Sequence, residues 1–189
     1  MSTKVVTGKV RFSYVHVFEP QQRNKDEEPK YSVTLLIPKS DEVTVKKIVE
    51  AIAEAAAQYR QKNGQNSLPQ KPNTTLHDGD GMRDSGENYG TECRGCYVMT
   101  VSSKRKPVIV DSFRNQITDP DEIYSGCYGR ASINFYGYNN SHGKKGISAG
   151  LLSLQKLSDG EPLGMTGSAD DFDDDFRDTT QEDIDDFLS

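Results

Sequence analysis

Only one stretch of this 189-residue chain has the periodicity of an amphipathic helix, while most other apolar residues alternate along short segments. Within residues 41–63, apolar side chains recur at intervals of three and four and form one stripe: Val45, Ile48, Val49, Ile52, Ala56 and Tyr59. Ser40 or Asp41 can cap the start of this helix, and Gly64 stands where a helix ends. One helix among many short strands restricts the chain to a mainly-β architecture.

Alternating segments predict the strands. Residues 8–20 alternate so that one face carries Val10, Phe12, Tyr14, His16 and Phe18. Further strand candidates are residues 30–38, 96–103, 107–111, 123–138 and 147–157, of which 123–138 is the longest. Residues 65–95 predict a long loop, a feature that is usually functional or disordered. This order predicts a five-stranded oligonucleotide-binding (OB) barrel with one α-helix after the second strand.

Charge divides the chain into two parts. Residues 158–189 hold twelve Asp or Glu and one Arg, a net charge of −11, whereas the other 157 residues carry +5. We therefore predict a domain of residues 1–157 followed by a disordered acidic tail of residues 158–189. Such asymmetry indicates an interaction with nucleic acid. No apolar run approaches the roughly 18 residues that span a bilayer, and the start lacks a signal peptide, so an intracellular protein is expected.

The segment 128–138 separates into two faces of different chemistry. One face, which can pack a core, carries Gly129, Ala131, Ile133, Phe135 and Gly137. The other face carries Tyr128, Arg130, Ser132, Asn134, Tyr136 and Tyr138. Tyrosine rings can stack on bases and Arg130 can neutralise a phosphate, which predicts DNA contacts at Tyr128, Arg130, Tyr136 and Tyr138. Alternatively, tyrosines line a half-buried strand simply because they suit sheets.

Two basic turns lie close to that segment in the sequence. One turn carries Lys104, Arg105 and Lys106, and the other carries Lys144 and Lys145. A single basic turn is usually solvated surface. Two such turns beside a tyrosine-bearing strand predict a groove that follows a phosphate backbone.

Three groups of residues have partial metal-binding patterns, and none predicts a metal site. Cys93 and Cys96 have the spacing of a zinc knuckle, but further ligands would be scattered single residues: Cys127, His77 and His142. Cys127 is expected to pack as a small apolar side chain. A calcium-loop template fits Asp171, Asp173, Asp175 and Glu182, yet Phe176 replaces the required glycine. Asp78 and Asp80 could hold magnesium in a nuclease, although a DGDG run is more often a turn.

Three segments together resemble a family of bacteriophage single-stranded-DNA-binding proteins, long catalogued as a domain of unknown function. They are GKVRFSYVHVFEP, KYSVTLLIPKSD and IYSGCYGRASINFYGYNNSHGKKGISAGLLSLQKLSDGEPLG. The resemblance implies an OB fold, a role in replication or recombination, no catalytic residues and no cofactor. The architecture is similar to that of single-stranded-DNA-binding proteins of small lytic coliphages, which also carry an acidic tail. Bacterial counterparts end in a terminal Phe, whereas Leu188 and Ser189 follow Phe187 here.

We therefore expect a non-enzymatic protein that coats single-stranded DNA, with weak sequence preference, in the cytoplasm of an infected or lysogenic bacterium. The tail would compete with DNA for the groove and then dock on replication proteins such as a polymerase, helicase or primase. Its docking residues would be Phe172, Phe176, Ile184 and Phe187. A tail kept only for solubility, a DNA-mimicking inhibitor and a magnesium-dependent nuclease are the alternatives, and a homodimer is left open.

Overall fold

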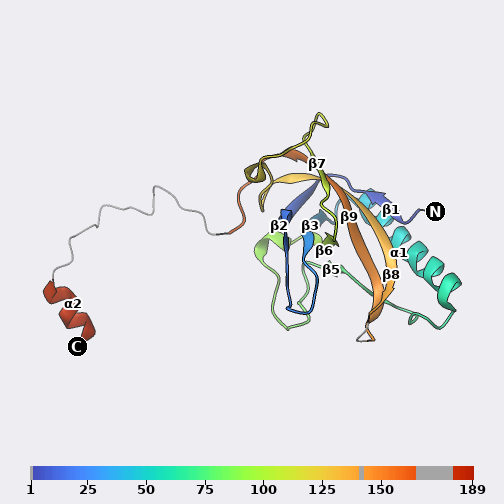
Figure 1. The fold of residues 1–189 in the computed structure, drawn as a ribbon, viewed down its shortest axis with the longest axis horizontal. Helices are drawn as coiled ribbons and strands as arrows, with labels where there is room; N and C mark the ends of the chain where they lie inside the picture. The colour runs from blue at the N-terminus through green and yellow to red at the C-terminus, as the bar shows by residue number, and fades with distance from the viewer. Residues whose placement is uncertain (1, 141–142, 165–180) are drawn as a thin grey trace.

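The computed structural model describes residues 2–140, 143–164 and 181–189, and its body is a ring of strands with one long helix beside it (Figure 1). The strands are β1 (Lys4–Val6), β2 (Val10–Gln21), β3 (Lys30–Pro38), β4 (Asn73–Thr74), β5 (Leu76–Asp78), β6 (Cys96–Ser103), β7 (Val108–Val110), β8 (Tyr128–Asn139) and β9 (Lys145–Ser158). The helices are α1 (Glu42–Asn63), α2 (Gln181–Leu188) and the single turns η1 (Thr91–Cys93) and η2 (Pro120–Glu122). Among these helices, none is long and apolar enough to cross a membrane.

Five long strands close the ring. Strand β2 pairs with β3, β3 with β6, β6 with β9, β9 with β8, and β8 again with β2. All of these pairings are antiparallel except that of β6 with β9. This topology confirms the predicted mainly-β OB architecture, with α1 following the second long strand. The four short strands extend the edges of the ring.

The two faces of β8 are those predicted from its alternation. Ala131, Ile133 and Phe135 are buried inside the ring, whereas Arg130 and Tyr136 lie outside. Strand β8 begins at Tyr128, so the prediction that it begins at residue 123 was wrong. Residues 123–127 form a turn whose Gly126 has φ +117°, a conformation that suits glycine rather than a regular strand. Strand β9, with 14 residues, is longer than β8 with 12.

Helix α1 is capped as its sequence predicts. The carboxylate of Asp41 accepts a hydrogen bond from the Thr44 backbone N–H (3.1 Å), and Gly64 ends the helix at φ +101°. The predicted stripe needs one correction, because Val49 is exposed and the buried row is completed by Ala51 and Ala55. These small side chains let the helix approach the ring closely.

The predicted alternation of β2 breaks at Tyr14. Val10 and Phe12 are buried as expected, but a β-bulge between Ser13 and His16 shifts the register with β3. Beyond the bulge Val17 is buried instead, and Tyr14 is 61% exposed. The prediction that Tyr14 and His16 share one face with Val10 and Phe12 was therefore wrong, because an inserted residue exchanges the two faces of a strand.

Segments outside the long strands also pack on the ring. Within residues 65–95, which were expected to hold little regular structure, β4 pairs with β9 and β5 pairs with β6. Residues 159–164 follow β9 and remain in contact with the body: Leu163 packs in a small cluster with Leu36, Cys93 and Val98. We call residues 159–164 the tail root.

Candidate nucleic-acid interface

A groove of about 730 Å³ runs across the outer side of β2, β3 and β6. We call it the front groove, and its lining is Ser13, Tyr14, His16, Gln21, Gln22, Arg23, Thr34, Leu36, His77, Arg83, Asp84, Ser85, Tyr89, Cys93, Val98 and Thr100. The lining thus combines two tyrosines, two histidines and two arginines with a single carboxylate. In an OB fold this side of the sheet is the one that binds oligonucleotides and oligosaccharides.

Tyr14 is held in the groove by a constrained backbone. Its φ of +46° lies in the left-handed region, which a bulky residue without a local cause seldom adopts. The bulge at this position supplies the cause, and its effect is to turn the ring of Tyr14 away from the core toward solvent. Strain of this kind is concentrated at functional sites, where the surrounding structure maintains it.

The loop between β5 and η1 forms a wall of the groove. Its residues 82–88 make a small hairpin in which the Arg83 N–H donates to the carbonyl of Glu87 (2.8 Å). The guanidinium carbon of Arg83 lies 4.6 Å from the ring centroid of Tyr89, and Tyr89 in turn packs on the cluster of Leu36 and Cys93. A cation and an aromatic ring are therefore held side by side at the groove wall.

An ionic clasp attaches this wall to β3. The Lys39 ammonium contacts a carboxylate oxygen of Asp78 (2.6 Å) and one of Asp80 (2.7 Å), and Asp80 also accepts from the Gly95 N–H (3.0 Å). The hydrogen bond from Lys39 lowers the pKa of both carboxyl groups. Asp78 and Asp80, considered above as magnesium ligands of a nuclease, thus share the Lys39 ammonium instead.

The predicted basic turn at residues 104–106 lies near the hairpin loop that joins β2 and β3. Lys104 forms an ion pair with Glu28 of that loop (3.0 Å), and the Lys106 ammonium lies 5.3 Å from the ring centroid of Phe18. Arg105 is exposed. Arg23, in the same hairpin loop, lines the front groove, so this turn lies next to one end of the groove.

The second basic turn lies at the tip of the β8–β9 hairpin. Lys144 and Lys145 are both exposed, and the Lys144 N–H donates to the side-chain oxygen of Asn140 (2.9 Å). Neither residue is part of the lining of the front groove.

The four residues of β8 that were predicted to contact DNA all lie outside the front groove. Arg130 belongs to a shallow depression of about 330 Å³ on the outer side of β8 and β9, with β1 and β7 at its edges. We call this surface the rear face; it is lined by Lys4, Val6, Val110, Arg114, Arg130, Ala131, Ser132, Ser153, Leu154 and Gln155. Tyr136, 45% exposed, lies on the same side of β8.

The other two tyrosines of β8 are half-buried. Tyr128 is flanked by the Lys9 ammonium (5.0 Å from its ring centroid) and the Arg11 guanidinium (5.4 Å). Tyr138 pairs with Gly146 of β9 in the antiparallel ladder of β8 and β9. As DNA contacts, the four β8 residues remain predictions.

Among the described residues, the thiols have no partners arranged to hold a metal ion. Cys127 is fully buried, which confirms that it packs as an apolar side chain, and burial raises the pKa of the Cys93 and Cys96 thiols. Within the described ranges, His, Cys, Asp and Glu side chains nowhere gather in a group of three or more that could hold a metal ion. His142 and the calcium-template residues 171, 173 and 175 lie outside the described residues.

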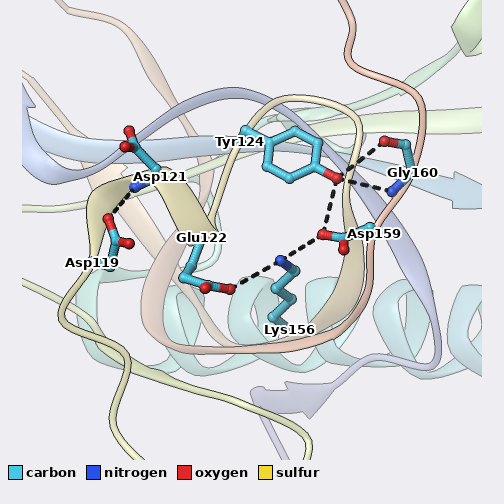
Figure 2. Close-up of polar contacts among 7 residues, drawn as sticks. All are labelled: Asp119, Asp121, Glu122, Tyr124, Lys156, Asp159 and Gly160. Atoms are coloured by element: carbon cyan, nitrogen blue, oxygen red, sulfur yellow. Dashed lines mark hydrogen bonds and ion pairs between the residues drawn. The ribbon is translucent and has the colours of Figure 1, made fainter.

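A polar network fixes the start of the tail root (Figure 2). The Lys156 ammonium bridges Asp159 (2.7 Å) and Glu122 (3.3 Å), while the Tyr124 hydroxyl donates to Asp159 (3.0 Å) and accepts from the Gly160 N–H (3.1 Å). Burial lowers the pKa of Lys156, but its bonds to the two carboxylates outweigh this and raise it overall. The chain therefore leaves β9 in a fixed direction.

That direction leads to the front groove. The Arg11 guanidinium donates to the carbonyl of Glu161 (2.6 Å), and the Leu163 N–H donates to the carbonyl of Ser125 (2.8 Å). Leu163 and Gly164 then border a small hollow together with Tyr14. The acidic tail thus begins beside the exposed aromatic ring of the groove.

The predicted docking residues are only partly described. Phe172 and Phe176 lie outside the described residues, as does the side chain of Ile184. Phe187, in α2, is 89% exposed.

Sequence reasoning missed the main aromatic and cationic residues of the groove. Tyr14 was predicted to share a face with Phe12 because alternation does not reveal a bulge. Arg83 and Tyr89 lie in the loop of residues 65–95, and the length of that loop was the one available signal that it is functional.

Comparisons with known proteins identify the family of the chain. A family model described as the single-stranded-DNA-binding protein of Enterobacter phage Enc34 matches residues 3–188. The putative protein p50 of Acyrthosiphon pisum secondary endosymbiont phage 1 is 32% identical over 179 residues, which cover 90% of this chain and 93% of that protein.

Solved structures extend the comparison to the fold. The single-stranded-DNA-binding protein from bacteriophage Enc34 in complex with single-stranded DNA has a TM-score of 0.72 and 31% identity, covering 86% of this chain and 90% of that chain. The protein gp2.5 of bacteriophage T7 has a TM-score of 0.58 with 15% identity and covers 94% of this chain and 98% of its own. The T7 likeness concerns the fold alone.

Proposed function

The chain belongs to the family of phage single-stranded-DNA-binding proteins described by the Enterobacter phage Enc34 protein, and we propose that it binds single-stranded DNA in the front groove. One observation carries this proposal. The strained, exposed Tyr14 lies in a groove that also contains the Arg83–Tyr89 pair, so flat rings and cations line one path. The solved complex of the Enc34 protein with single-stranded DNA supports the same ligand class.

Binding would combine stacking with charge neutralisation. Tyr14 and Tyr89 offer ring surfaces to successive bases, and each stacked base contributes about 1–3 kcal/mol with little dependence on its identity. Arg83 and Arg23 would neutralise phosphates inside the groove, and the basic turn at residues 104–106 would continue the path beyond Arg23. This mode predicts a weak sequence preference and a strong dependence on salt.

The acidic tail would act as an intramolecular competitor. After Gly164 the chain holds ten Asp or Glu and one Arg, a net charge of −9. Because the tail root is fixed beside Tyr14, the segment that carries these carboxylates is tethered next to the cationic groove. A polyanion held there competes with non-specific ligands and is displaced by a single strand.

Once displaced, the tail would be available to partners. We expect Phe172, Phe176, Ile184 and Phe187, spaced among carboxylates, to dock on basic and apolar pockets of a polymerase, helicase or primase. The role would be to coat single strands during phage replication or recombination in the cytoplasm of the host, without catalysis.

A binding measurement tests the proposed function. Fluorescence anisotropy with a labelled oligo-dT strand should give tight binding at low salt that weakens steeply as the salt concentration rises. The same sequence as a duplex should bind much more weakly, since paired bases cannot reach Tyr14 and Tyr89. Equal affinity for the two forms would contradict stacking as the source of binding.

A further inference from the structure

The rear face carries an unusual concentration of positive charge outside the front groove. Lys4, Arg114 and Arg130 all line it, and in the described part of the chain none of the three forms an ion pair with a carboxylate. Arg130 is held in position, because its Nε donates to the carbonyl of Thr7 (2.9 Å), while its side chain remains exposed. Arg130 is therefore fixed on β8, and all three charges are exposed and available to a ligand.

Aliphatic side chains share this face with the cations. Val6 lines the rear face at the edge strand β1, and Val110 lines it at β7. Two further exposed side chains adjoin it: Val108, which pairs with Ser153, and Leu152. Branched aliphatic groups offer little flat surface to a base but pack well against apolar side chains of a peptide. The chemistry of this face fits an acidic, amphipathic peptide better than a nucleic-acid strand.

The chain itself contains a segment of that chemistry. Helix α2 spans Gln181–Leu188, and its eight residues include four carboxylates and no basic residue. At its end Phe187 and Leu188 are 89% and 75% exposed. Acidic groups beside an exposed Phe-Leu pair complement a face that combines cations with valines.

We propose that the rear face binds helix α2 of a second copy of this chain. A second copy is favoured because each chain's own tail root ends beside Tyr14, on the side of the ring formed by β2, β3 and β6. The contact is heterologous, since the tail of one copy meets the rear face of the next. Such a contact leaves a free rear face on one copy and a free tail on the other, so it can continue from copy to copy along one strand.

A complementation experiment on the full-length chain tests this inference. The first variant, Arg114→Glu/Arg130→Glu, alters the rear face and keeps the tail. The second variant, Phe187→Ala/Leu188→Ser, alters the tail and keeps the rear face. Sedimentation velocity at low salt should show self-association of the unaltered chain, and each variant alone should associate at least about tenfold more weakly. Mixing the two variants should restore a one-to-one complex, because one intact tail then meets one intact rear face.

Three experimental results distinguish this proposal from the alternatives, in which the copies do not associate, the tail binds the front groove, or the rear face binds DNA. Failure of the mixture to associate, or absence of self-association in the unaltered chain, would overturn the proposal. A saturating short oligo-dT should leave the association intact or strengthen it; if oligo-dT abolishes it, the tail binds the front groove of the second copy instead. The Arg114→Glu/Arg130→Glu variant should bind oligo-dT as the unaltered chain does. A loss of DNA affinity there, with association retained, would assign the rear face to DNA and also overturn the proposal.

Circular dichroism and thermal unfolding of both variants control for folding. The substituted side chains are exposed, so both variants should keep the fold. The unfolding midpoint of Phe187→Ala/Leu188→Ser should equal that of the unaltered chain, and that of Arg114→Glu/Arg130→Glu should fall only slightly, because the hydrogen bond from Arg130 to Thr7 is lost. The proposal is independent of the proposed function, because self-association and binding of oligo-dT are measured separately.

Discussion

The front groove and the rear face both present arginine on the outside of the same ring, yet their shapes and apolar groups differ. The front groove is the larger, at about 730 Å³ against about 330 Å³, and a loop forms one of its walls. It pairs its cations with rings, as in Arg83 on Tyr89, whereas the rear face sets its cations among valines. Charge alone therefore does not identify a nucleic-acid site; the apolar partner of each cation decides which ligand fits.

The largest expected difference between the two surfaces concerns their tyrosines. Tyr14→Ala should weaken oligo-dT binding by about 1–3 kcal/mol, because one stacking surface is removed. Tyr136→Ala is the matched control on the rear side, since it removes the same ring from a similarly exposed position. Anisotropy titrations of both variants give the comparison, and a greater loss of affinity from Tyr136→Ala would move the DNA site to β8.

The salt dependence of binding should separate a groove cation from a remote one. Arg83→Ala should lower the slope of log affinity against log salt by about 0.7, the value expected when one phosphate of a single strand is no longer neutralised. Lys47→Ala, on the exposed side of α1, is expected to leave the slope unchanged. Identical slopes for the two variants would remove Arg83 from the phosphate path.

Removing the acidic tail should strengthen the binding of single-stranded DNA in the front groove. Deletion of residues 166–189 should tighten oligo-dT binding by about threefold to tenfold at low salt, where charges are least screened, and have little effect at high salt. The same titration on Lys156→Met, which removes the ion pairs of Lys156 with Asp159 of the tail root and with Glu122, should show a smaller gain of the same sign. Weaker binding after the deletion would reject the competing tail.

The faces of β8 and the capping of α1 follow from local patterns, and both were predicted correctly from residues such as Ile133 and Asp41. The front groove could not be predicted in the same way. Its principal ring, Tyr14, is exposed by a bulge that depends on pairing between β2 and β3, and its wall comes from a loop positioned by Lys39. Periodicity identifies which residues share a face within a regular strand, but it does not report register shifts or long-range contacts.

The ion pairs of Lys39 with Asp78 and Asp80 should contribute the smallest effect, a change in unfolding temperature that depends on pH. Lys39 lowers the pKa of Asp78 and Asp80, so its stabilisation is complete above the unfolded carboxyl pKa of about 3.9 and is lost as the pH falls through the lower folded value. Lys39→Met should therefore have a lower unfolding temperature than the unaltered chain at pH 7 and 5. This difference in unfolding temperature should become smaller below about pH 4. A difference that grows in acid would contradict the proposed ion pairs of Lys39.

The most direct test of the front groove is photo-crosslinking of the full-length chain to single-stranded DNA, followed by tryptic digestion and mass spectrometry. The peptides 12–23 and 84–94 contain Tyr14 and Tyr89, whereas the peptide 131–144 contains Tyr136 and Tyr138. Binding in the front groove predicts that crosslinked nucleotides are found on the first two peptides. Crosslinks concentrated on peptide 131–144 would contradict it.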